Sequence, residues 1–355
     1  MMPELTLHYG DHELKLEVPD ANFGGLLRPC DIRGDCDILP VLKKAVGANR
    51  ERFQTQARNR KVLLLIADHT RDEPHLSMVE AVLPLLEEAS SVTILMATGS
   101  HHSRARENLQ LVRNLESLLQ GFRLPPASLQ IHDAISADFV NLGKTRAGTP
   151  IEVNHLLVEA DVICVLSDMK PHYFAGYSNA LKYFLPGTAS FAAIEHNHAF
   201  ALDDHATFGR HPLHPDPQRR DNPVANDMAD FAQRVIGERP AWALVTIASS
   251  SEIHWACFDT LKVAVERGIQ ATDERMITPC APTSHLVVSC GGYPHDESLY
   301  TAQRALELSA AVLEPAARVL LLAQCRNGIA PTPSARKNFY EPMCRPLEET
   351  LQLIR

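Results

Sequence analysis

The sequence lacks the features that mark membrane, secreted and nucleic-acid-binding proteins. It has no run of about 18 apolar residues, the least that a transmembrane helix needs. The residues after Met1 alternate between polar and apolar types without a signal-peptide core, so we expect a cytoplasmic protein. No block of basic residues is present and the formal net charge is −9, which argues against nucleic acid or a membrane as a partner. The oligomeric state is left open.

Motifs for common cofactor sites are also absent. The eight cysteines are scattered and form no C-x-x-C pair, which argues against a zinc ribbon and predicts free thiols in the core. Neither G-x-G-x-x-G nor G-x-x-x-x-G-K-[ST] occurs, so the sequence has no dinucleotide fingerprint and no P-loop. What is present is ordinary for a globular protein: 355 residues, 45% hydrophobic and 22% charged, are enough for two domains with cores of their own.

Apolar runs that alternate with helical patterns predict an α/β fold with two domains, mostly parallel sheets and an active site in the cleft between the domains. Arg239-Pro240 is typical of a linker. We therefore expect an N-terminal domain over 1–239, a C-terminal domain over 240–340, and a helix in 341–355 that could pack back onto the first domain. The expected strands are Lys61–Ala67, Ser91–Ala97, Asp161–Leu166, Trp242–Ala248, His285–Ser289 and Arg318–Ala323.

Polar residues follow three of the expected strands. Asp68 and Arg71 come after the first, His101 after the second and His172 after the third. The carboxyl ends of parallel strands meet at one edge of a sheet, where open α/β sheets bind their ligands. The alternatives are that Asp68 only caps the next helix and that His101 is a solvated residue at a helix start. For His102 the solvated alternative is the stronger one.

The stretch Ser167–Phe200 holds two lysines and three histidines in a sequence that is too apolar for an ordinary surface loop. We expect a helix over Tyr177–Leu185 that ends at Pro186-Gly187. Lys182 on this helix either extends to solvent or faces a pocket, where burial would lower its pKa and make it nucleophilic. Lys170 is expected to be a solvated loop residue.

Two further segments are rich in histidine. His196 and His198 are two apart on an expected helix and do not share a face, so they are not expected to bind one metal together. Residues 203–223 combine proline, histidine and charge, which predicts a surface loop or lid whose histidines are mostly exposed to solvent.

Taken together, these motifs resemble the lactate racemase family of nickel-pincer nucleotide enzymes. The motifs are, in order, DHTR, TGSH, PHYFAGYS-x3-K-x3-PG, NH and GGYPHD-x3-Y, and they span the chain from about Val41 to Gly328. Each motif is weak alone, whereas the ordered set is specific.

The resemblance implies an isomerase that racemises or epimerises a small 2-hydroxy acid. Its cofactor would be the nickel complex of a pyridinium-3,5-bisthiocarboxylic acid mononucleotide, supplied by cofactor biosynthesis enzymes and linked covalently to Lys182. By position, His198 would bind the nickel and Asp68 would help to position the cofactor. His101 and His172 would be the acid/base pair, and the substrate would be bound by Arg71, Tyr300 and Arg304.

This chemistry is consistent with the residues. The C2 proton of a 2-hydroxy acid is too weakly acidic for a side-chain base, so hydride leaves instead while a base takes the hydroxyl proton. The resulting planar keto acid can receive hydride on either face, and two bases are needed because the two enantiomers place their hydroxyls differently. Histidine suits both tasks because its pKa of about 6.5 allows it to act as acid or base.

The chain departs from the family pattern in two places. Asn179, Ala180 and Leu181 stand where the family usually has a glycine pair and an arginine. Arg304 stands where the lactate enzymes have a lysine, and a guanidinium binds acidic groups in a bidentate way. Two alternatives remain open: a carrier of the nucleotide without turnover, and a zinc hydrolase that would use His101, His172 and His198.

Overall fold

The structure is a computed structural model that describes residues 4–27, 34–330 and 333–354. It divides into two compact units, one formed by Cys30–Ile277 and the other by Met1–Pro29 together with Thr278–Arg355. These limits differ from the boundary expected at residue 239, because strand β11 (Ala241–Ala248) follows directly after Pro240 and pairs with β8 (Val162–Asp168) inside one sheet.

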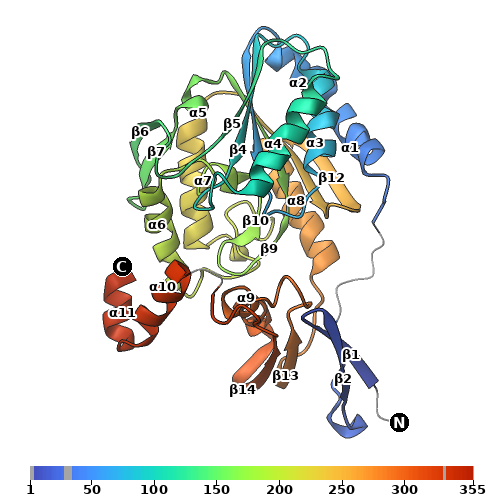
Figure 1. The fold of residues 1–355 in the computed structure, drawn as a ribbon, viewed down its shortest axis with the longest axis vertical. Coiled ribbons are helices and arrows are strands. Elements are labelled where there is room, and N and C mark those ends of the chain that lie inside the picture. Colours follow the sequence, from blue (N-terminus) through green and yellow to red (C-terminus); the bar gives the residue numbers. More distant parts are fainter. Residues whose placement is uncertain (1–3, 28–33, 331–332, 355) are drawn as a thin grey trace. The chain divides into compact units, whose positions relative to one another are not determined.

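The larger unit is built on a six-stranded sheet with the order β12-β11-β8-β3-β4-β5 (Figure 1). All neighbours are parallel except β12, which runs antiparallel to β11. This confirms the predicted α/β fold with a mostly parallel sheet. Its other strands are β3 (Lys61–Ala67), β4 (Ser91–Ala97), β5 (Ala127–Ile131) and β12 (Ile253–Thr260).

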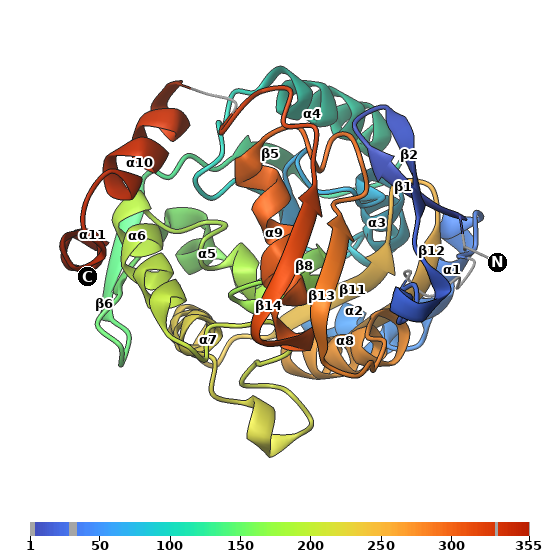
Figure 2. The same cartoon turned by 90° about the horizontal axis from the view of Figure 1, so that it is seen from below.

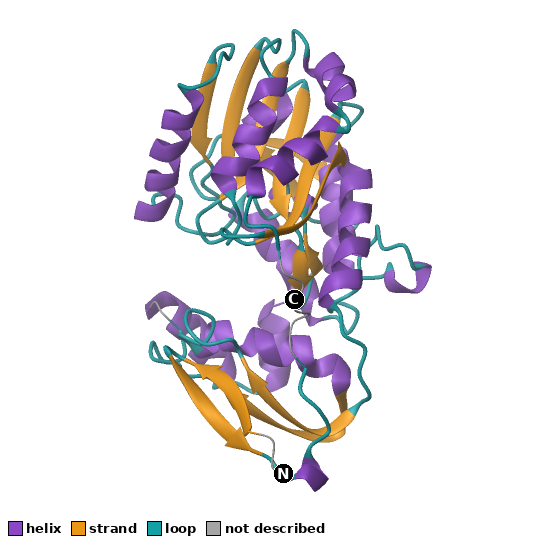
Figure 3. Ribbon diagram, turned by 90° about the vertical axis from the view of Figure 1, so that its right-hand side faces the viewer, coloured by secondary structure: helices purple, strands orange, loops and turns teal. Residues whose placement is uncertain are grey.

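Helices cover both faces of this sheet (Figure 3). Alternate residues of β3 divide between two cores: Leu63 and Leu65 pack into one, and Leu64 packs into the other. A strand that is buried on both faces needs a continuous apolar run, which is why this pattern was readable in the sequence. The helices are α1 (Ile38–Gly47), α2 (Arg50–Ala57), α3 (His75–Val82), α4 (Arg106–Leu119), α5 (His155–Glu159), α6 (Phe191–Ala199), α7 (Pro223–Ile236) and α8 (Leu261–Met276).

The prediction of a helix over Tyr177–Leu185 is wrong. The chain forms a short antiparallel pair, β9 (Lys170–His172) with β10 (Gly176–Ser178), and then a single 3₁₀ turn, η3 (Ala180–Tyr183). Asn179 is extended and its side chain accepts a hydrogen bond from the backbone N–H of Leu181, so it starts a new turn instead of continuing a helix. Lys182 therefore lies on a tight turn.

Other elements of the larger unit extend the predicted set. Helix α8 continues through Gly268, which packs so closely that a Cβ would lie 2.7 Å from the Cε of Met169. Two strands, β6 (Phe139–Lys144) and β7 (Pro150–Asn154), form an antiparallel pair. Short 3₁₀ turns include η2 (Leu83–Leu85), η4 (Phe200–Leu202) and η5 (Pro217–Arg219).

The smaller unit contains an N-terminal hairpin, β1 (Glu4–Tyr9) with β2 (His12–Glu17), and a parallel pair, β13 (Thr283–Ser289) with β14 (Leu313–Leu322). Figure 2 shows β13 and β14 side by side with α9 (Leu299–Ser309) next to them. The buried carboxylate of Asp296 joins these parts, since it accepts hydrogen bonds from the N–H groups of Gly10 and Gln324. The remaining elements are η1 (Asp20–Asn22), η6 (Ala310–Val312), α10 (Pro333–Met343) and α11 (Leu347–Ile354).

Two expectations from composition can be compared with the described ranges. None of their helices combines the length and the apolar character needed to cross a bilayer. The seven cysteines within these ranges are free thiols, as predicted, but only Cys164 and Cys257 are buried, so the expectation that they lie in the core is wrong for the others; Cys30 lies outside these ranges.

Candidate active site

Three polar strand ends meet at one edge of the large sheet. Strands β8, β3 and β4 are consecutive neighbours and parallel, so the residues that follow them lie at the same edge. The loops after β3 and β8 are in contact, since Lys170 Nζ donates to the carbonyl of Asp72 at 2.9 Å. The loop after β4 contacts the turn that follows Lys182, through a 3.0 Å hydrogen bond from Gly99 N to Gly187 O. This gathering confirms the arrangement expected from the strand pattern.

Asp68 and His101 form a close pair within this edge. His101 Nδ1 lies 2.8 Å from Asp68 Oδ2, and the hydroxyl of Thr70 donates to Asp68 Oδ1 at 2.6 Å. Burial alone would raise the pKa of the Asp68 carboxyl, but the hydrogen bond from His101, its charge, and the contributions of Thr70 and Arg71 outweigh burial and lower that pKa. A buried carboxylate that fixes the tautomer and orientation of an exposed imidazole is a suitable partner for an acid/base histidine.

A buried carboxyl pair lies beneath the loops after β3 and β8. Glu73 Oε2 accepts a hydrogen bond from the backbone N–H of Asp168 at 3.0 Å. Burial, followed by the charge of Asp168, raises the pKa of Glu73 well above its ordinary range. Lys170, expected to be a solvated loop residue, is instead partly buried and forms an ion pair with Asp168 at 3.0 Å. Glu73 was not singled out from sequence, because nothing in its local pattern shows that it is buried.

Lys182 is almost completely buried, with 7% of its surface exposed. Its backbone N–H donates to Asn179 O at 3.0 Å, and its carbonyl accepts from Gly187 N at 2.8 Å. Gly187 is required here, since a Cβ would lie 2.6 Å from the carbonyl oxygen of Tyr183. Of the two alternatives for Lys182, the structure favours a lysine held in the protein interior over one that extends to solvent.

The ring of Phe174 is in contact with three of the predicted site residues. Its centroid lies 4.6 Å from that of His172 and 5.3 Å from that of His198, both in edge-on geometry. Lys182 Nζ lies 6.0 Å from the same centroid. Phe174 therefore brings together residues that are far apart in the sequence. The only sequence signal for its role was its position between His172 and the later pair His196 and His198.

His198 is held in its neutral form. Burial, with a further contribution from the positive charge of Lys182, lowers its pKa to about 4. Its Nδ1 atom is buried and has no hydrogen-bond partner among the described residues. In contrast, Nδ1 of His196 lies 2.9 Å from the hydroxyl of Thr149, so the two histidines of α6 have different surroundings, as their spacing predicted.

The histidine-rich segment 203–223 differs from its expected character. His211 and His214 are buried, with 1% and 2% of their surface exposed, whereas His205 is exposed. Burial, with a smaller contribution from His214, lowers the pKa of His211 to about 3. Two of its three histidines therefore fill interior space beside Tyr177, contrary to the expectation, while 215–218 and 220–221 are exposed as expected of a surface loop.

The predicted substrate-binding residues lie in different units. Arg71 is half-buried in the loop after β3. Tyr300 and Arg304 lie on α9 of the smaller unit, with the guanidinium carbon of Arg304 5.8 Å from the centroid of the Tyr300 ring. The resemblance implies that Arg71, Tyr300 and Arg304 bind the substrate together, and this stays a prediction.

A zinc site made by the protein alone has no support in the described part of the chain. No group of three or more histidine, cysteine, aspartate or glutamate side chains there could hold a metal ion. The zinc hydrolase alternative needs three such ligands. The partly buried imidazole of His198, whose Nδ1 has no hydrogen-bond partner among the described residues, instead suits a metal whose remaining ligands come from another molecule.

Comparison with known proteins gives a consistent result. Residues 9–209 match the family model described as the lactate racemase N-terminal domain. The chain is 26% identical to a lactate racemase from Thermoanaerobacterium thermosaccharolyticum, covering 92% of this chain and 76% of the relative. It is 22% identical to a lactate racemase from Lactiplantibacillus plantarum, with the same coverage.

Solved structures share the fold. The apoprotein structure of the lactate racemase from Thermoanaerobacterium thermosaccharolyticum superposes with a TM-score of 0.77 at 24% identity, covering 92% of this chain and 76% of that one. A crystal structure of a protein from Thermotoga maritima gives a TM-score of 0.56 at 18% identity, covering 72% of this chain and 63% of that one.

Proposed function

Because the chain belongs to the lactate racemase family, we propose that it is an isomerase that racemises or epimerises a small 2-hydroxy acid with a nickel-pincer nucleotide as cofactor. The observation that carries this proposal is the gathering of His172, Lys182 and His198 around the ring of Phe174. A base, a nucleophilic amine and a metal ligand are the three protein groups that such a cofactor requires.

The residues present fit the proposed cofactor. A metal ligand must be a neutral imidazole, and His198 is neutral at physiological pH because its pKa lies at about 4. Its buried Nδ1 has no other partner among the described residues. Lys182 is held in the interior beside it, where its amine could form the thioamide link. Bound there, the nucleotide would supply nickel with soft sulfur ligands and a ring carbon that accepts hydride from C2 of the substrate.

The protein's own residues would move the proton. His101 or His172 takes the proton of the substrate hydroxyl while hydride leaves C2, and the other histidine returns a proton when hydride comes back on the opposite face. Asp68 keeps the His101 ring oriented through the 2.8 Å contact. A positioned acid/base group of this kind contributes about 10²–10⁴-fold to the rate. Arg71, at the same strand edge, would bind the substrate carboxylate.

The test is a screen of 2-hydroxy acids for loss of optical activity, with protein that is co-expressed with the cofactor-making enzymes. We expect His101→Ala and His172→Ala each to lower racemisation by at least about 10²-fold. His102→Ala is the matched control, because His102 is exposed in the same turn as His101. Near-normal turnover in either active-site variant would contradict the two-base scheme. Protein that carries nickel but converts no hydroxy acid would favour a carrier.

A further inference from the structure

Residues 203–222, which connect η4 to α7, lie against the stretch that carries Lys182; this connection is called the clamp segment here. Asn222 Nδ2 donates to the carbonyl of Phe174 at 2.8 Å. Gly176 has φ +75°, and a Cβ at this position would lie 1.9 Å from the carbonyl oxygen of Arg210. The two backbones are therefore in direct contact at a position where only glycine fits.

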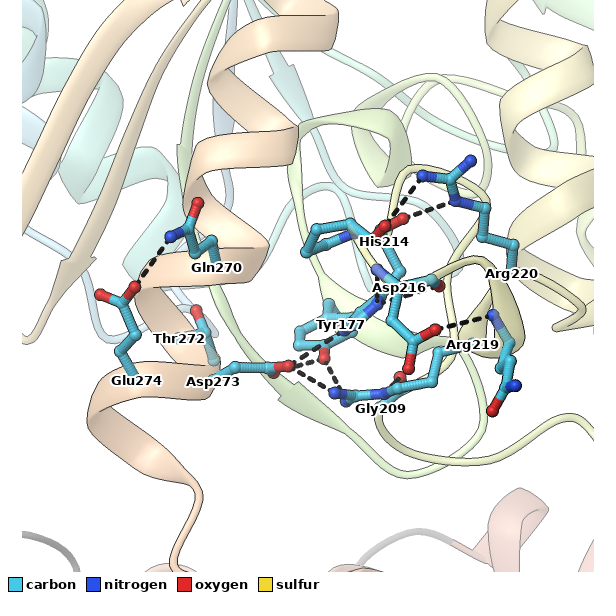
Figure 4. A network of polar contacts seen from close by, with 12 residues as sticks. Tyr177, Gly209, His214, Asp216, Arg219, Arg220, Gln270, Thr272, Asp273 and Glu274 are labelled. Carbon is cyan, nitrogen blue, oxygen red and sulfur yellow. Dashed lines mark hydrogen bonds and ion pairs between the residues drawn. The ribbon is translucent and has the colours of Figure 1, made fainter.

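The carboxylate of Asp273 joins the clamp segment to the stretch it contacts (Figure 4). The hydroxyl of Tyr177 donates to Asp273 Oδ1 at 2.5 Å, and Arg219 Nη1 donates to Oδ2 at 2.6 Å. His214 Nε2 lies 3.0 Å from the same Oδ2. Asp273 comes from α8, so this one side chain ties a packed helix to both the clamp segment and β10.

The geometry of Arg219 completes the connection. Its Nη2 donates to the Tyr177 hydroxyl at 2.9 Å and its Nε donates to the carbonyl of Gly209 at 2.7 Å. A planar guanidinium that bonds in three directions has one orientation only, so it fixes the distance between the clamp segment and Tyr177. Burial, followed by Asp273, raises the pKa of Tyr177, which therefore remains a donor throughout the physiological range.

A short path leads from Tyr177 to the proposed active site. The carbonyl of Tyr177 accepts from Asn179 Nδ2 at 3.0 Å, and the backbone N–H of Lys182 donates to Asn179 O at 3.0 Å. On the other side, the β10 residue Gly176 pairs with His172 of β9. A displacement of Tyr177 would therefore move both His172 and Lys182.

We propose that Asp273 is a positioning residue: through Tyr177 and Arg219 it holds β10, and thereby His172 and Lys182, in place. The roles of His172 and Lys182 come from the proposed function, on which this inference rests. The clamp itself can be tested without cofactor or substrate. Failure of the positioning role of Asp273 can therefore be distinguished from failure of the proposed function.

The first test is amide hydrogen exchange on the full-length protein without cofactor. We expect Asp273→Asn and Tyr177→Phe to speed exchange in 170–182 and in the clamp segment by about tenfold or more, because the first removes the charge to which Tyr177 and Arg219 donate and the second removes the hydroxyl that donates to it. Exchange in β3 should not change. Tyr177→Phe keeps the ring and leaves Asp273 paired with Arg219, so it provides the test if Asp273→Asn does not fold.

Glu274→Gln is the matched control. Glu274 is the next residue of α8, loses the same charge in the variant and is exposed; it accepts from Gln270 at 2.9 Å (Figure 4) and forms an ion pair with Arg275 at 3.4 Å. Unchanged exchange of 170–182 in both clamp variants would overturn the proposal. An equal increase in Glu274→Gln would also overturn it, because the effect would then come from helix charge.

The second test uses the enzyme loaded with cofactor. Turnover is counted per bound nickel, so that a loss of stability does not change the measured rate. We expect Asp273→Asn to lower kcat by about tenfold to 100-fold, the cost of a small displacement of reacting groups. KM should remain within about twofold because Arg71 lies on another loop. A raised KM with normal kcat would contradict a positioning role. A wild-type protein that is inactive would refute the proposed function and leave the exchange result to decide the clamp.

Discussion

His101 Nδ1 lies 2.8 Å from Asp68 Oδ2, and the two side chains come from loops that follow adjacent parallel strands. Each strand end alone was compatible with a helix cap or a solvated turn. The pair has a more specific meaning, because a buried carboxylate next to an exposed imidazole controls which ring nitrogen carries the proton.

Removal of this carboxylate should reduce the reaction without unfolding the protein. We expect Asp68→Asn to lower racemisation on the order of 10²-fold, since an amide neither fixes the imidazole tautomer nor stabilises its charged form. Polarimetry on the loaded enzyme measures this. Asp72→Asn, in the same loop, should stay near wild-type activity. Equal activity of Asp68→Asn and wild type would show that the pair has no part in proton transfer.

The same pair predicts a dependence of stability on pH. The pKa of Asp68 is lowered in the folded protein, so its stabilising contribution is present above the unfolded value of about 3.9 and is lost as pH falls through the folded pKa. The difference in unfolding free energy between wild type and Asp68→Asn should therefore shrink below about pH 4. Urea unfolding at several pH values measures it. A constant difference across this range would contradict the prediction.

Glu73 should show the opposite behaviour. Burial and Asp168 raise its pKa, so its contribution is complete below the unfolded value of about 4.3 and is lost as pH rises through the folded pKa. Glu73→Gln resembles the protonated acid and should become more stable than wild type as pH rises. Unfolding in urea at pH 5, 7 and 9 compares them, with Glu107→Gln at an exposed site of α4 as control. Parallel curves for wild type and Glu73→Gln would contradict this.

His198 and His196 give a matched pair for the metal. We expect His198→Ala to lose nickel by more than the roughly 10–100-fold that the loss of an outer-shell partner costs, because the proposed nickel ligand is removed. His196→Ala should keep it, since that ring contacts Thr149. Metal analysis of protein co-expressed with the cofactor pathway gives the answer. Equal nickel in both variants would remove His198 as the ligand.

The partly buried His198 also predicts a dependence of stability on pH. The folded pKa of His198 lies at about 4, below the unfolded value of about 6.5, so the protein loses stability as pH falls between these values. His198→Ala should lack this part of the acid destabilisation when the two proteins are unfolded in urea over that range. If the unfolding free energy of both proteins fell equally steeply with pH, another group would cause the acid destabilisation.

Lys182 is the proposed covalent anchor. Lys182→Ala should show no added nucleotide mass in intact-protein mass spectrometry, because no other amine replaces it in the proposed link. Lys170→Ala is the control, since Lys170 at the start of β9 pairs with Asp168 at the end of β8. A nucleotide adduct that persists in Lys182→Ala would assign the attachment to another residue.

The sequence by itself determined the architecture of the sheet and the order of its polar strand ends. Continuous apolar runs such as Lys61–Ala67 are legible because a central parallel strand is buried on both faces, and burial leaves a periodicity that is local in the chain. The placement of His101 and His172 at strand ends followed from the same pattern. Parallel pairing of β8, β3 and β4 then required these ends to meet.

Only the tertiary structure decided how the Lys182 stretch folds and what holds it. The helix predicted over Tyr177–Leu185 does not form, because Asn179 is extended and its side chain starts a separate turn. His214 is buried and contacts Asp273 and Tyr177. These contacts join residues that are far apart in the chain. No local periodicity records such contacts, because the free energy that stabilises them comes from packing and pairing across separate elements.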